Sequence, residues 1–210
     1  YQHIAKIYAW FIGDMDEARR YAHKAVEEID PSDKSREASI SYAGATTVLI
    51  WANPEESKRY MEKAIEISEE MGYKDLLAGH YALLSWMHRF TGNQTERLQA
   101  REKALAYLPY LKGSDLREYS VACAVAGIYD EELSREGLET GLKSGVTWST
   151  IITACHLGAI YRSRGEDEQA IEVYEQGWRL GVRRRFTFSY LTDLARGLMA
   201  LYAERGERLK

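Results

Sequence analysis

The sequence predicts an all-α protein in which antiparallel helix pairs stack as a solenoid, with about five pairs and one extra helix. Two observations predict this fold class. A step of twelve residues joins a turn position to a small residue five times, at 13–25, 52–64, 92–104, 129–141 and 165–177. The small residues that close these steps are 39, 40, 37 and 36 residues apart, and a fixed period of this length is typical of helical repeats.

The turn positions divide the chain into successive units. In order, these units are approximately 1–31 (turn at Gly13), 35–72 (Ala52), 75–110 (Gly92), 114–146 (Tyr129) and 149–182 (Gly165). A partial unit at 185–210 carries Leu198, Tyr202 and Gly206 but stops before its second helix. We therefore expect one continuous repeat domain over 1–210 that is a piece of a larger protein.

Helix boundaries within the units can be predicted from local chemistry. Asn53-Pro54 predicts a helix start, because Asn accepts bonds from free backbone N–H groups and Pro suits the first helical position. The other two prolines, Pro31 and Pro109, are also expected at boundaries, since Pro breaks a helix interior.

The unit at 149–182 carries the most complete pattern: Leu157-Gly158, then Tyr161, the turn Gly165, and Ala170, Tyr174 and Gly177 at helical spacing. This pattern resembles the tetratricopeptide repeat (TPR) family over essentially the whole chain. The resemblance implies a right-handed superhelix, with Gly158 and Ala170 at close helix–helix contacts. The long units more narrowly resemble sensor regions of signal-transduction ATPase-type transcription regulators and the peptide receptors of quorum sensing.

The composition excludes several classes of function. The chain has 28 basic and 32 acidic residues, a net charge of −4, which argues against direct binding of nucleic acid. No stretch approaches the ~20 apolar residues of a membrane span, and no secretory signal opens the chain. We therefore expect a cytoplasmic protein without a membrane partner.

Catalytic and metal-binding motifs are missing from the sequence. There is no Walker-type loop, His-Glu-x-x-His motif, Cys-x-x-Cys pair or Gly-x-Ser-x-Gly elbow. His80 and His88 are two helical turns apart, ~12 Å, which is too far for a shared metal without other ligands. Cys123 and Cys155 lie in apolar helical stretches and are expected to be buried thiols. We expect no enzyme activity, no catalytic residue, no metal and no cofactor.

Binding is expected on the concave surface, which stacked repeats build from the first helix of each unit. Trp, Tyr and Arg are over-represented at binding hot spots. The register predicts these ligand-binding residues: Trp10, Tyr42, Thr46, Trp86, Arg89, Tyr119, Arg162 and Arg196. The alternative is that the aromatic residues only pack in the core, since aromatic side chains at helical spacing are more often core. The Lys and Asn clamp by which the family holds peptide carboxylates is mostly replaced here by apolar or aromatic residues.

Two functions follow as hypotheses. The first is a non-catalytic sensor module of a regulatory protein, which recognises a small effector or a peptide and contacts neighbouring domains of the full-length protein. The second is a constitutive scaffold for protein–protein interaction.

Overall fold

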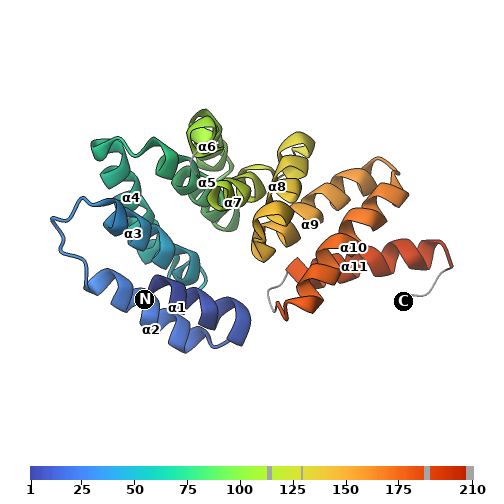
Figure 1. Cartoon of the computed structure of the whole chain (residues 1–210), viewed down its shortest axis with the longest axis horizontal. Coiled ribbons are helices and arrows are strands. Elements are labelled where there is room, and N and C mark those ends of the chain that lie inside the picture. Colours follow the sequence, from blue (N-terminus) through green and yellow to red (C-terminus); the bar gives the residue numbers. More distant parts are fainter. Residues whose placement is uncertain (113–114, 129, 187–189, 207–210) are drawn as a thin grey trace. The chain divides into compact units, whose positions relative to one another are not determined.

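The computed structural model describes residues 1–112, 115–128, 130–186 and 190–206, except for the side chains of Trp10 and Phe90. Within these residues the protein has eleven α-helices, a short π-helix and no strand (Figure 1). The predicted all-α class is therefore confirmed. The chain divides into two compact units, Tyr1–Asp115 and Leu116–Lys210.

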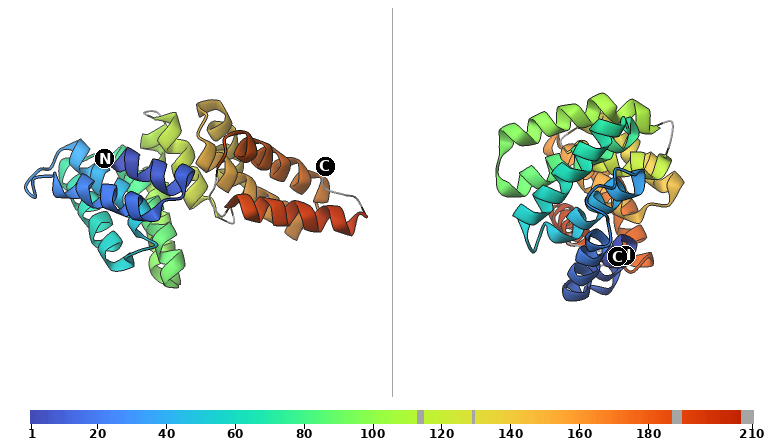
Figure 2. Two further views of the ribbon diagram at one scale, coloured as in Figure 1. Left: turned by 90° about the horizontal axis from the view of Figure 1, so that it is seen from below. Right: turned by 90° about the vertical axis from the view of Figure 1, so that its left-hand side faces the viewer.

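The first unit holds three helix pairs, each joined by a short turn. These are α1 (Gln2–Ile7) and the π-helix (Tyr8–Ile12) with α2 (Met15–Glu27), α3 (Arg36–Leu49) with α4 (Pro54–Met71), and α5 (Lys74–Thr91) with α6 (Gln94–Lys112). The second unit holds two pairs and one further helix. These are α7 (Leu116–Ala126) with α8 (Glu131–Ser144), α9 (Thr147–Ser163) with α10 (Asp167–Arg183), and α11 (Tyr190–Glu204). Figure 2 shows the pairs from two further sides.

Four of the five predicted turn positions, and all five small-residue positions, lie where the sequence period predicts them. Gly13, Gly92 and Gly165 have positive φ angles of 81°, 75° and 75° between paired helices, a backbone conformation that favours glycine. Ala52 also lies in a turn, whereas Tyr129 lies outside the described residues. The five closing small residues are all buried in the second helix of their pairs: Ala25, Ala64, Ala104, Gly141 and Gly177.

Of the two positions expected at close helix–helix contacts in the fifth pair, Gly158 shows such a contact and Ala170 is buried. A Cβ atom at Gly158 would lie 2.3 Å from the Tyr174 ring of α10. Ala170 is completely buried. Gly197 of α11 contacts the same ring, since its Cβ would lie 2.7 Å away. The Tyr174 ring therefore lies between two glycines on two different helices.

Side-chain caps begin several second helices. Asp14 accepts from the Asp16 and Glu17 N–H groups ahead of α2, and Asp130 accepts from the Leu133 N–H ahead of α8. Each cap satisfies backbone donors that have no partner inside the helix.

The three prolines do not all lie at helix boundaries. Pro54 is at the first turn of α4, as predicted, with the Asn53 side chain accepting from the Glu56 N–H. Pro31 lies in the turn after α2. The prediction for Pro109 is wrong, because this residue lies inside α6. Only three residues of the helix follow Pro109. The backbone hydrogen bond that α6 lacks, because Pro has no N–H, is therefore in its final turn.

Buried hydroxyl groups link the helices of a pair. Ser57 Oγ donates to the Thr46 carbonyl at 3.0 Å, which joins α3 to α4. The single hydroxyl hydrogen of Thr46 is shared between the Tyr42 carbonyl of its own helix, at 3.0 Å, and the Ser57 carbonyl of α4, at 3.3 Å. In the second unit, Ser120 Oγ of α7 donates to the Gly137 carbonyl of α8 at 3.3 Å. These bonds satisfy polar groups that the close packing has removed from water.

Cys123 and Cys155 are buried free thiols, as expected. The Cys155 Sγ lies 3.3 Å from the Tyr190 carbonyl at the start of α11, to which it donates. Burial raises the pKa of the Cys155 thiol. Among the helices described, none combines the length and apolar character that crossing a membrane requires.

Candidate functional site

The structure buries most of the aromatic residues expected to bind a ligand. Tyr42 is 8% exposed, and its ring centroid lies 5.9 Å from that of Tyr60. Thr46 is 1% exposed and donates to the Tyr42 carbonyl at 3.0 Å. Trp86 is 4% exposed, and its ring meets the half-exposed Trp51 edge-on at 5.8 Å.

Tyr119 in α7 is also buried, and burial together with Glu136 raises the pKa of its phenol. The burial of Tyr42, Thr46, Trp86 and Tyr119 agrees with the packing alternative, in which these residues form the core. Ligand binding by these side chains stays a prediction.

The three arginines of the predicted site are exposed. Arg162 pairs with Glu204 at 3.0 Å, and Arg196 lies 3.6 Å from Asp193 on its own helix. Arg89 is exposed near the end of α5. The side chain of Trp10 lies outside the described residues. The predicted residues fall in both units, and Tyr42 and Thr46 contact each other.

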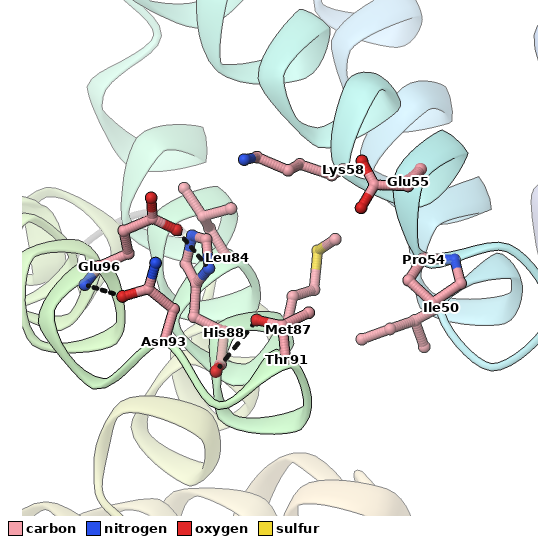
Figure 3. Close-up of a pocket in the computed structure, with 10 residues that line it drawn as sticks. All are labelled: Ile50, Pro54, Glu55, Lys58, Leu84, Met87, His88, Thr91, Asn93 and Glu96. Carbon is pink, nitrogen blue, oxygen red and sulfur yellow. Dashed lines mark hydrogen bonds and ion pairs between the residues drawn. The ribbon is translucent and has the colours of Figure 1, made fainter.

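A pocket of about 290 Å³ lies in the first unit, between α4, the end of α5 and the start of α6. Its apolar side is formed by Ile50, Leu84 and Met87. Figure 3 shows Lys58 extending from α4 over the pocket, with His88 and Glu96 on the opposite wall. Small-molecule sites commonly combine an apolar surface with a few polar groups in this way.

His88 and Glu96 form the main polar contact of the pocket wall. Nδ1 of His88 lies 3.1 Å from a Glu96 carboxylate oxygen, and the imidazole side chain is only 9% exposed. Burial lowers the pKa of His88, although Glu96 acts in the opposite direction. The ring is therefore neutral at neutral pH, with Nδ1–H donating to Glu96 and Nε2 left as an acceptor.

Local bonds hold the two wall residues in place. Asn93 Oδ1 accepts from the Glu96 N–H at 3.2 Å, which fixes the first turn of α6. Thr91 Oγ1 donates to the His88 carbonyl at 3.3 Å, which fixes the last turn of α5. Lys58 lies 3.9 Å from Glu62 on its own helix, and its side chain remains 43% exposed. The pocket therefore offers an apolar floor, a neutral imidazole and charges of both signs.

Sequence reasoning did not find this pocket. The spacing of His88 from His80 does not point to a pocket, and Lys58 and Glu96 belong to no recognisable motif. In the part of the chain that the structure describes, no three His, Cys, Asp or Glu side chains are placed so that they could hold a metal ion. The available signal was the pair of acid and base flanking the Gly92-Asn93 turn, at positions 88 and 96.

Comparison with known proteins adds no assignment. No protein-family model matches the chain, and no curated protein matches it.

Proposed function

We propose that this chain is a non-catalytic binding module of the helical-repeat class, TPR-like and arranged as a right-handed superhelical solenoid. In this proposal it belongs to a regulatory protein and recognises a small effector or a peptide. The support for the class is the set of adjacent helix pairs with buried small residues on each second helix.

The observation that carries the binding proposal is the pocket of the first unit. Its volume is near the lower limit for small-ligand sites, which is about 300 Å³. Ile50 and Met87 would contact an apolar body of the ligand. Lys58 would pair with a carboxylate, while the His88 Nε2 would accept from a donor. A small apolar molecule with polar ends, such as a hydrophobic amino acid or a dipeptide, fits this combination.

The proposal is tested by isothermal titration calorimetry, in which the protein is titrated with a panel of free hydrophobic amino acids and dipeptides. Thr91→Trp should abolish binding, since Thr91 is an exposed residue of the pocket lining and the larger ring would fill the space. Leu98→Trp is the matched control, because Leu98 is exposed on α6 but does not line the pocket. Lys58→Glu should weaken carboxylate-bearing ligands selectively.

The alternative is a constitutive scaffold that docks a partner protein. It is favoured by the apolar side chains that α1 and the π-helix expose: Ile7 is 49% exposed and Ile12 is 59% exposed. If no member of the panel binds, or if both Trp variants bind equally well, the small-effector proposal is overturned and the scaffold is favoured.

A further inference from the structure

A second concave surface lies in the unit Leu116–Lys210, independent of the pocket described above. It is a groove of about 570 Å³ between α8 and α10, and its floor comes from α9. One wall is a continuous face of α8: Glu131, Arg135, Leu138, Glu139 and Leu142. The other wall is a face of α10: Gln169, Glu172, Val173 and Gln176. We call this surface the α8–α10 groove.

Its shape suits a helix. The two walls belong to the second helices of neighbouring pairs, and both helices contact α9. The α8 face spans residues 131–142, about 16 Å at 1.5 Å per residue. A helical segment of about three turns would match that length, and helices commonly pack by setting side-chain ridges into such grooves.

The charges along the groove are uneven. At one end, Glu131 bonds both Arg135 at 2.5 Å and Arg164 at 2.6 Å, so both cations already have a partner. Further along, Glu139 and Glu172 are exposed on opposite walls, and neither forms an ion pair among the described residues. This part of the groove therefore has an uncompensated negative charge and attracts a cation.

Apolar surface lies beside these carboxylates. Leu142 is 49% exposed on the α8 wall, and the buried parts of the two walls include Leu138 and Val173, which are 6% and 8% exposed. An occupant that only carried positive charge would leave Leu142 in water. An occupant with apolar residues on the same face as its cations would cover it.

We propose that the α8–α10 groove docks an amphipathic helix of a partner protein, with leucine-like side chains on Leu142 and a Lys or Arg between Glu139 and Glu172. This is helix-in-groove recognition, on the second helices of the pairs. It does not depend on the small-molecule pocket of the other unit.

The test uses the whole chain and a defined probe, a fluorescein-labelled 14-residue helical peptide of Leu and Lys with all Leu on one face. Fluorescence anisotropy should show binding that weakens as salt is raised, because exposed charge pairs are screened. Two peptides serve as controls: one with Glu in place of Lys, and one with Ala in place of Leu. Both should bind at least about fivefold more weakly, since one exposed interaction of about 1 kcal/mol corresponds to that factor.

Variants then locate the site. Glu139→Lys and Glu172→Lys should each weaken the Leu/Lys peptide by about fivefold or more. Glu102→Lys is the matched control, because it makes the same charge change at an exposed position on α6 and should leave affinity unchanged. Leu142→Ser should weaken the peptide without altering the salt dependence, and as an exposed substitution it should not unfold the protein.

The proposal is overturned if the Leu/Lys peptide does not bind, or if Glu102→Lys reduces affinity as much as Glu139→Lys, since the attraction would then be general. It is also overturned if Leu142→Ser has no effect, because the peptide would then be held by charge alone. The pocket variant Thr91→Trp should bind the peptide normally, so failure here and failure of the small-effector proposal are distinguishable.

Discussion

The Tyr174 ring lies between Gly158 of α9 and Gly197 of α11, and a Cβ atom at either glycine would come within 2.7 Å of it. The ring is 6% exposed, so it has little room to move away from an added methyl group. At residue scale, the packing of three helices therefore depends on two positions that lack a side chain.

Gly158→Ala should lower the free energy of unfolding by about 1–3 kcal/mol, because the new methyl group overpacks the Tyr174 ring. Gly79→Ala is the matched control. Gly79 lies within α5 with no atom near its Cβ position, and Ala in a helix interior is more favourable than Gly by about 0.5–1 kcal/mol. Urea denaturation measures both variants. Equal midpoints for the two would contradict the contact.

His80 should make stability depend on pH. The ring is 4% exposed, and its Nδ1 lies 3.3 Å from Ser68 Oγ. Burial, with a smaller effect of Arg36, lowers its pKa from 6.5 to about 4, while Asp75 acts in the opposite direction. The folded protein therefore holds His80 neutral at pH values where the unfolded chain binds a proton.

The direction in which pH changes the free energy of unfolding follows from the proton that the unfolded chain binds. Between pH 6.5 and about 4 the unfolded chain binds the extra proton, so the free energy of unfolding falls as the pH falls. The slope from this group is at most about 1.4 kcal/mol per pH unit, on the order of 3 kcal/mol in all. In His80→Gln this contribution should vanish while that of His88 remains. Parallel curves for the parent and the variant would show that His80 does not titrate in this way.

Close contacts between helices could be predicted from the sequence, whereas the burial of aromatic side chains could not. The close contact at Gly158 was predicted correctly, because close backbone approach requires a small residue at fixed helical spacing. Whether Tyr42 and Trp86 would be buried could not be decided, because a helix that faces a groove and one that faces the core can carry aromatics at the same period.

At element scale, the α3–α4 pair is held by the reciprocal hydroxyl bonds of Thr46 and Ser57. Thr46→Val removes one of these bonds while keeping the shape of the side chain. We expect a loss of about 1 kcal/mol, and a similar loss for Ser57→Ala.

The double variant should lose about the sum of the single losses, because each hydroxyl donates to a different carbonyl and the two bonds have no atom in common. Thr95→Val on the exposed surface of α6 is the control and should change little. Thermal melts of all four variants measure the effect, and a double loss far from the sum would show that the two bonds are coupled.

Element boundaries were predictable where a cap or a first-turn proline defines them, as at Asn53-Pro54. The boundary expected at Pro109 was wrong, because α6 continues for three residues past it, although a proline cannot donate to the carbonyl four residues back. The small-molecule pocket could not be predicted from the sequence, since Lys58 and Glu96 are on separate helices. Their approach depends on how α4 packs with α5 and α6. A sequence period gives the order of helices but not the side chains that converge between them.

At the scale of the whole molecule, the chain forms the units Tyr1–Asp115 and Leu116–Lys210. Repeat proteins gain stability mainly from contacts between neighbouring elements. We therefore expect the fragment 1–115 to fold alone, with a cooperative thermal transition by circular dichroism. The fragment 1–52 should not, because it separates α3 from α4 and exposes the apolar side chains that the pair buries. A non-cooperative thermal transition of 1–115 would show that this unit does not fold independently of the rest of the chain.

The two cysteines give the second unit internal reporters of local opening. Alkylating reagents attack the thiolate, so Cys155 can react only after the start of α11 leaves it, because burial raises its pKa and Tyr190 accepts from its sulfur. Cys123 is 0% exposed in α7. It can react only after a different part of the unit opens, the α7–α8 pair. If α11 detaches before the α7–α8 pair opens, maleimide should label Cys155 first in native buffer. The ratio of the two labelling rates would then measure how far the last helix frays ahead of the rest.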